Sequence, residues 1–222
     1  PALLKSMLIN TSRAKTGVSN FPVQKESSAV YNLDDVLHYY GDNRTHPVRY
    51  LRNMDGTALQ TGEQNPHTVY VTDEHLALKV TLVWTDYPGE SFDGGLINDL
   101  DLEVVTPDKT THYKGNNFYP GQALSFAGGL ADKINNVEQV IVEAPSKGEW
   151  SIVVKGTAIP VIERQIAGQG YALVVTGALG EQTKFWIIIF RFTVLFVLAY
   201  FLIRLLKNYG LSRKTVAPEN IS

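Results

Sequence analysis

Seven short segments of alternating polarity fill the middle of the chain, and their spacing restricts its fold more than any other feature. Such period-two alternation is the pattern of a β-strand with one buried face. Turn-forming sequences, such as Tyr87-Pro88-Gly89 and Pro145-Ser146-Lys147-Gly148, separate the segments. The segments cover residues 68–72, 76–86, 96–106, 111–114, 137–143, 150–155 and 171–176. This arrangement, without long intervening helices, predicts a mainly β fold, an antiparallel β-sandwich or jelly roll, over residues 49–179.

Alternation within the strands also assigns residues to faces. Between residues 96 and 104, three acids share one face: Asp99, Asp101 and Glu103. The opposite face, which we expect in the core, carries Leu96, Asn98, Leu100, Leu102 and Val104. Trp84 and Trp150 also fall in strand patterns, so we expect them to anchor the core; the alternative is a platform on which a sugar stacks.

The N-terminal residues have helical rather than strand spacing. Residues 1–10 begin with proline, which suits a first helical turn, and their apolar positions follow the period of a helix packed on a partner surface. Those positions are Leu3, Leu4, Met7 and Leu8. A second helix is expected over residues 32–40, where Asn32 can cap its start and Gly41 can end it.

An apolar segment near the C-terminus predicts a membrane-spanning helix. Residues 185–206 are mostly Leu, Ile, Val and Phe. At 1.5 Å per residue, a helix of this length spans roughly 33 Å, enough for the hydrocarbon core of a bilayer. Arg191 and Arg204 interrupt the segment, but both lie away from its centre, where long side chains reach the headgroups. We therefore expect one transmembrane helix in contact with the lipid bilayer.

The charge distribution predicts the orientation of that helix. Residues 184–222 carry six Lys or Arg and one Glu, a net charge of +5. Because the whole chain has a net charge of −2, residues 1–183 carry −7. The positive-inside bias places residues 207–222 in the cytoplasm and residues 1–183 in an extracellular or luminal space, as in a type I membrane protein. The acidic body argues against nucleic acid as a partner. Two sequons, Asn10-Thr11-Ser12 and Asn43-Arg44-Thr45, would then face a glycosylating lumen.

No pattern predicts a catalytic or cofactor-binding residue within this chain. Cysteine is absent, which excludes thiol catalysis and Cys-ligated metal centres. The five histidines lack the spacing of a metal site, and no nucleophile-elbow or phosphate-binding glycine motif occurs.

A calcium site is one interpretation of the acids around residues 86–101. The candidate ligands are Asp86, Asn98, Asp99 and Asp101, because hard oxygen ligands at close spacing suit Ca²⁺. Asp99 and Asp101 project to the same side of a strand, which is the strongest feature of this hypothesis. The alternative is a solvated acidic strand face with turn-forming aspartates.

Several segments together resemble the C-terminal part of a subtilisin-like serine peptidase, from the branch with a jelly-roll domain after its catalytic domain. The most specific match is V-W-T-D at 83–86 followed by N-D-L-D-L at 98–102. PALLKSMLIN at 1–10 is similar to the last long helix of the catalytic domain, and NLDDVL at 32–37 to the short helix that closes it. Further matches to the jelly-roll domain follow in order at 135–140, 144–150 and 169–177.

The resemblance implies a protease that cleaves protein or peptide substrates with an Asp-His-Ser triad. All three triad segments would lie upstream, so we expect this fragment to be inactive alone. Residues 1–41 would complete the α/β catalytic domain, residues 42–48 would form a linker, and the sandwich would stabilise the catalytic domain and could hold calcium. The alternative is a non-enzymatic, membrane-tethered β-sandwich that binds carbohydrate or protein.

Overall fold

The computed structural model describes residues 1–14, 29–31, 36, 49–53, 58–88, 95–160, 168–180, 198 and 200–206. The chain divides into two units, Pro1–Glu181 and Gln182–Ser222. In the second unit, the described residues 198 and 200–206 are α-helical. No helix among the described residues is both long enough and apolar enough to span a bilayer. Most of the expected span at 185–206 lies outside the described residues.

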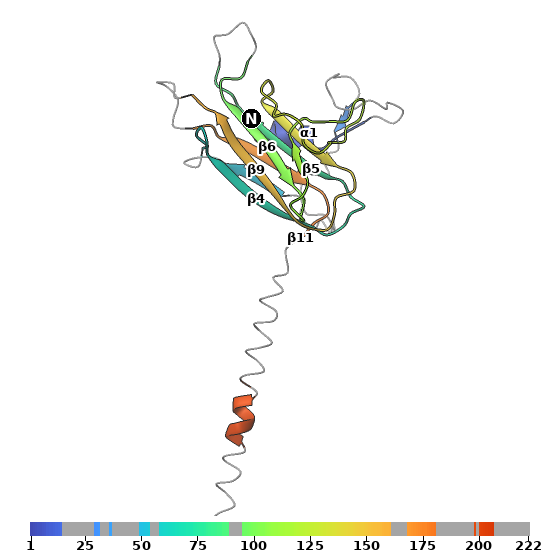
Figure 1. The fold of residues 1–222 in the computed structure, drawn as a ribbon, viewed down its shortest axis with the longest axis vertical. Helices are drawn as coiled ribbons and strands as arrows, with labels where there is room; N and C mark the ends of the chain where they lie inside the picture. Colours follow the sequence, from blue (N-terminus) through green and yellow to red (C-terminus); the bar gives the residue numbers. More distant parts are fainter. Residues whose placement is uncertain are drawn as a thin grey trace, which may run out of the picture. The chain divides into compact units, whose positions relative to one another are not determined.

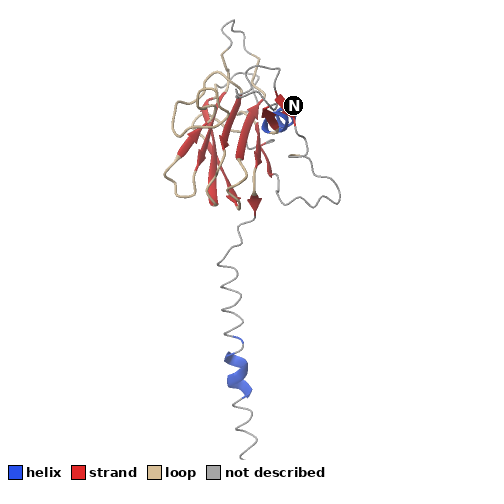
Figure 2. Ribbon diagram, turned by 90° about the vertical axis from the view of Figure 1, so that its right-hand side faces the viewer, coloured by secondary structure: helices blue, strands red, loops and turns tan. Residues whose placement is uncertain are grey.

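Two antiparallel sheets form the first unit, which confirms the expected mainly β fold (Figures 1 and 2). The four-stranded sheet has the order β3 (Arg49–Asn53), β10 (Tyr171–Thr176), β5 (Leu78–Trp84), β8 (Val137–Val142). The five-stranded sheet has the order β11 (Leu179–Gly180), β4 (Gln64–Val71), β9 (Gly148–Ala158), β6 (Asp99–Val105), β7 (His112–Lys114). A separate hairpin pairs β1 (Ser12–Ala14) with β2 (Ala29–Tyr31).

One hydrophobic core lies between the two sheets. Inward side chains of both sheets belong to it, including Leu82 of β5, Leu173 of β10 and Ile152 of β9. Trp84 and Trp150 are each 1% exposed, and their indole N–H groups donate to the carbonyl oxygens of Asn98 and Ser146. Both tryptophans are therefore core anchors, as predicted, and neither offers a ring face to a sugar.

The strand predictions are confirmed in position and differ in extent. All seven predicted segments contain a strand, and the burial of β6 alternates as expected: Leu100, Leu102 and Val104 are fully buried. β4 begins four residues earlier than predicted, and β9 runs three residues further, because each lies beside long partner strands that satisfy its backbone groups. The short β11 at residues 179–180 carries no alternation from which it could be predicted.

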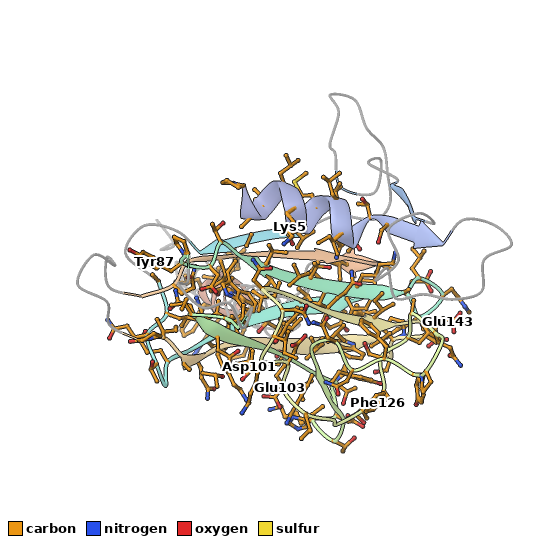
Figure 3. All side chains as sticks on the ribbon, turned by 90° about the horizontal axis from the view of Figure 1, so that it is seen from above. Lys5, Tyr87, Asp101, Glu103, Phe126 and Glu143 are labelled. Atoms are coloured by element: carbon orange, nitrogen blue, oxygen red, sulfur yellow. The ribbon has the colours of Figure 1, made fainter. Side chains whose placement is uncertain are left out.

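The N-terminal helix α1 (Ala2–Asn10) packs on the outer face of the four-stranded sheet, against β5 and β10 (Figure 3). The prediction of a packed helix is confirmed, but polar residues make the buried contact. Ser6 and Asn10 are fully buried, whereas Leu4 is 62% exposed. This helix explains why both faces of β5 are buried, including the outward residues Thr81 and Val83.

Several predicted segments fall outside the described residues. Within the second predicted helix at 32–40, only Val36 is described, and its side chain is buried. The predicted linker at 42–48, the sequon at Asn43 and the tail at 207–222 are not described.

Candidate functional site

A group of carboxylates lies where β6 extends beyond its short neighbour β7. The β7 strand pairs only with Glu103–Val105 of β6. At the next residue, the Leu102 carbonyl accepts a hydrogen bond from Gly115 N at 2.9 Å, and the Leu102 N–H donates to Glu138 Oε2 at 2.7 Å. Glu138 belongs to β8 of the other sheet, so one carboxyl group completes the edge of β6 and connects the two sheets.

Glu138 is a buried acid with one unsatisfied oxygen. Its side chain is 1% exposed, and Oε1 has no hydrogen-bond partner. Desolvation raises the pKa of Glu138 to about 9; the Leu102 N–H bond opposes this rise, and Asp101, Asp132 and Asp99 add to it. Glu138 is therefore protonated at neutral pH. A Cβ at Gly115 would collide with this carboxyl group, which explains the glycine there.

Asp99 and Asp101 lie on the outer face of the same strand, as predicted. Desolvation raises the pKa of Asp99, and the neighbouring Asp101 raises it further. One oxygen of Asp101 accepts a hydrogen bond from the Thr157 hydroxyl, whereas its Oδ1 is buried without a partner. Figure 3 shows Asp101 beside Glu103 on the side of the sandwich away from α1.

Asp132 supplies a fourth carboxylate from the loop that follows β7. Desolvation raises the pKa of Asp132, but hydrogen bonds from Asn116, Asn135 and two backbone N–H groups outweigh it, so the net shift is downward. Asp132 therefore stays ionised and affects the pKa values of both Asp99 and Glu138. We call Asp99, Asp101, Asp132 and Glu138 the acidic cluster.

The unsatisfied buried oxygens concentrate in or beside this cluster. Among the described residues, four buried side-chain polar atoms lack a hydrogen-bond partner, and all four are oxygens: Asn98 Oδ1, Asp99 Oδ1, Asp101 Oδ1 and Glu138 Oε1. An acceptor buried without a donor costs about 1–3 kcal/mol. Carboxylate oxygens in this state suit a hard cation or bound water.

The structure gives the other two predicted ligands different partners. Asp86 accepts hydrogen bonds from the backbone N–H groups of Tyr87, Ile97 and Asn98, at 2.8–2.9 Å, and so ties the two ends of the loop between β5 and β6. Asn98 lies on the core side, where its Nδ2 donates to Gln169 Oε1 at 2.7 Å. Asp99 and Asp101 thus lie together, while Asp86 and Asn98 are engaged elsewhere.

Sequence reasoning missed Glu138 and Asp132 as members of the cluster. Glu138 occupies an inward position of β8, in phase with the buried Val140, so an acid on the apolar phase of a strand was the available signal. Asp132 carried no such signal, because its place depends on the path of a long loop. As positioned, no three His, Asp or Glu side chains in the described parts of the chain come close enough to hold a metal ion.

The described histidines have other contacts. His67 Nε2 lies 2.7 Å from the Tyr171 hydroxyl, and desolvation lowers the pKa of His67 and raises that of Tyr171 to about 12. His112 Nδ1 lies 2.8 Å from Glu103, which also pairs with Lys155. The His67–Tyr171 contact joins the two sheets, and the Glu103 contacts join neighbouring strands of one sheet. All of them resemble structural pairs rather than a catalytic arrangement.

Comparisons with known proteins leave the family open. No family model and no curated protein matches the chain. A crystal structure of a protein from Sulfurospirillum deleyianum overlaps 61% of this chain and 99% of its own, at 9% identity and a TM-score of 0.32. The P-domain of Macrobrachium rosenbergii nodavirus overlaps 61% of this chain and 94% of its own, at 6% identity and a TM-score of 0.20. Neither overlap carries an argument about fold or function.

Proposed function

We propose that this chain is the C-terminal part of a membrane-anchored, subtilisin-like serine endopeptidase. The support begins with the sequence resemblance, in which V-W-T-D at 83–86 and N-D-L-D-L at 98–102 are the most specific segments. These segments cover the end of β5 and the start of β6 and lead into and out of one loop, whose ends Asp86 connects. In this proposal the two sheets are the jelly-roll domain of that branch.

The observation that carries the proposal is the polarity of α1. A short helix on a soluble domain normally buries its apolar side. Here the polar side, with Ser6 and Asn10, faces the sheet, and Leu4 is largely exposed. Among the apolar residues of α1, only Leu4 is exposed, while Leu3, Met7 and Leu8 are partly buried. An exposed leucine on a packed helix is expected if a second surface covers it. The resemblance supplies that surface, because it assigns residues 1–41 to the end of a catalytic domain.

This placement gives the catalytic domain, the sandwich and the apolar segment separate roles. In the complete protein, an upstream serine would attack the peptide carbonyl, a histidine would move the proton, an aspartate would orient the histidine, and oxyanion donors would stabilise the developing charge. The sandwich would support that domain by holding α1. The apolar segment 185–206 would anchor the enzyme to a membrane with residues 1–183 on the extracellular or luminal side, so that cleavage is confined to the membrane surface.

Labelling of the full-length protein with a fluorophosphonate probe, which reacts with activated serines, tests this proposal. We expect the full-length protein to be labelled, and replacement of the upstream triad serine by alanine to abolish the labelling. The 222-residue chain should not react. An upstream gene sequence that lacks a G-T-S-M-A-like segment within a few tens of codons would contradict the proposal.

We also propose that the acidic cluster binds calcium. As positioned, these side chains are too far apart to hold a metal ion, and Asp132 already accepts hydrogen bonds at both oxygens. Binding would therefore require Asp99, Asp101 and Asp132 to close around the ion, with Glu138 as a further oxygen. The support is that three of the four unsatisfied buried oxygens belong to this cluster. Bound calcium would offset the mutual repulsion of the carboxylates and fasten the loop that carries Asp132.

Thermal unfolding of the full chain with calcium and with chelator tests the calcium proposal. We expect Asp99→Ala to remove most of the rise in Tm that calcium produces in the unsubstituted protein. Asp108→Ala is the matched control, because Asp108 lies in an exposed turn at the end of β6 and bonds Thr106 and Thr110. A calcium effect that survives in Asp99→Ala would contradict the proposal.

A second candidate function, a membrane-tethered sandwich that binds carbohydrate or protein, is favoured by one observation. The buried polar contact makes α1 an integral part of the sandwich, as expected if the N-terminal helix belongs to the binding module itself. The upstream gene sequence separates the two candidates. A start codon and secretion signal directly ahead of Pro1 would favour the binding module.

A further inference from the structure

Asn10 makes the most extensive polar contact between α1 and the sheet. Its side chain is 1% exposed. Its Nδ2 donates to the carbonyl oxygens of Lys79 and Val174, each at 3.2 Å, and to Thr81 Oγ1 at 3.0 Å. Its Oδ1 accepts a hydrogen bond from Thr176 Oγ1 at 2.7 Å. One amide group thus connects α1 to both β5 and β10.

A wider hydrogen-bond network supports this contact. Ser6 Oγ donates to the Thr81 carbonyl at 2.9 Å, and Gln139 Nε2 of β8 donates to the Thr81 hydroxyl at 2.9 Å. The network therefore connects α1 with three neighbouring strands. A nine-residue helix is too short to be stable in water by itself, so its order depends on such contacts. We call the Asn10 contacts the clamp.

The clamp residue is also the acceptor asparagine of a sequon. Thr11 and Ser12, the other two sequon residues, are buried, and their hydroxyls donate to the carbonyl oxygens of Leu8 and Ile9. The clamp partners lie 69–166 residues later in the chain, so during synthesis the sequon precedes everything that buries it. A glycan on Nδ2 would replace one of its two hydrogens and add a bulky sugar where no solvent-accessible space remains.

We infer that Asn10 is a clamp residue that must stay unmodified, so that glycosylation of this sequon and docking of α1 on the sandwich exclude each other. Exposure of the sequon to a glycosylating lumen rests on the proposed function, whereas the clamp does not. In the proposed peptidase, the clamp is the contact through which the sandwich holds the end of the catalytic domain.

Hydrogen exchange on the full 222-residue chain in detergent tests the clamp. We expect Asn10→Ala to speed exchange of the α1 amides about 10- to 100-fold, since about three buried hydrogen bonds are lost, while amides of β9 and β6 keep their rates. Leu4→Ala is the matched control on the exposed side of the same helix and should change exchange less than about 3-fold. Equal effects of the two substitutions would overturn the clamp.

A milder variant and a pH series keep the test decisive if Asn10→Ala fails to fold. Thr176→Val removes one clamp hydrogen bond and should speed α1 exchange about 5-fold. Asn10→Asp directs a carboxylate at the acceptor oxygens of Lys79, Thr81 and Val174. Protonation at acidic pH restores one donor and should recover part of the lost protection. If α1 protection in Asn10→Asp, corrected for intrinsic exchange, does not rise between pH 7 and pH 5, the hydrogen-bond argument fails.

Glycopeptide mapping tests the exclusion. The chain is produced in a glycosylating eukaryotic host, and the fraction that resists limited proteolysis is digested and analysed by mass spectrometry. We expect Asn10 to be unmodified in that fraction and any glycan at Asn10 to occur in the protease-sensitive fraction. A glycan at Asn10 in protein with protected α1 amides would overturn the inference. Neither readout measures peptidase activity, so the result is independent of the peptidase proposal.

Discussion

Two buried polar regions on opposite sides of the sandwich differ in whether their side chains have hydrogen-bond partners. Under α1, the side chains of Asn10, Thr81 and Thr176 are neutral and partnered. In the acidic cluster, carboxylates lie together and three of their buried oxygens lack donors. A satisfied network fixes one geometry, whereas an unsatisfied one retains affinity for protons, water or cations. The first region therefore fixes the position of α1, whereas the second leaves buried oxygens without partners.

The largest effect is expected from Glu138→Gln. The pKa of Glu138 is raised from 4.5 to about 9 in the folded protein, so its contribution to stability is fully present below pH 4.5 and is lost as pH rises towards 9. Glutamine carries no titratable proton and removes this loss. In chelator at pH 8, we expect Glu138→Gln to raise the free energy of unfolding by on the order of 3–6 kcal/mol.

Urea unfolding between pH 5 and pH 9 measures this prediction. The stability of the unsubstituted protein should fall across that range, and the fall should be much smaller in Glu138→Gln. Glu143→Gln, at an exposed position just after β8, should keep the original pH dependence. If both variants show the same slope, Glu138 does not hold its proton in the folded state.

The next effect tests how closely the loop approaches the cluster. Gly115→Ala would place a Cβ against the Glu138 carboxyl group, and we expect it to destabilise the protein by about 1–3 kcal/mol. Combination with Glu138→Ala should recover part of this loss, because the colliding Oε2 and Cδ atoms are removed while the Glu138 Cβ remains. Strictly additive free energies in the double-mutant cycle would show that the two residues do not touch.

On the satisfied side, Thr81→Val should cost about 1–3 kcal/mol. The substitution keeps the shape of the side chain but removes the hydroxyl that accepts from Asn10 and Gln139, and it leaves the Asn10 donor buried. Thr68→Val, at an exposed position of β4, is the matched control and should change stability by less than about 0.5 kcal/mol. A pH-independent loss would distinguish this region from the acidic cluster.

The smallest effect is expected from Asp99→Asn in chelator. Desolvation and the neighbouring Asp101 raise the pKa of Asp99, so removal of its charge should relieve repulsion and raise Tm slightly, by about 1–4 °C. With calcium, the same substitution should lower Tm relative to the unsubstituted protein if the cluster binds the ion. Differential scanning calorimetry measures Tm in chelator and with calcium. A lower Tm under both conditions would contradict repulsion between Asp99 and Asp101.

The strands of the fold could be predicted closely from the sequence. The candidate metal ligands and the contacts of α1 could be predicted only in part. Strand alternation placed Asp99 and Asp101 on one face and Leu100 and Leu102 in the core, because that pattern is local. Asp86 looked equally suited to a metal, but three backbone N–H groups occupy its carboxylate. The side of α1 that packs on the sheet could not be predicted, since helical spacing identifies an apolar side without identifying what covers it.

By itself, the amino-acid sequence determined seven of the strands and the turns between them, because those choices depend on neighbours a few residues apart. The tertiary structure alone decided which polar groups find partners. Asn10 meets Val174 across 164 residues of chain, and Leu102 meets Glu138 across 36. Hydrogen bonds and carboxylate repulsion act over a few ångströms in space, so their outcome is set only when the sheets and loops have come together.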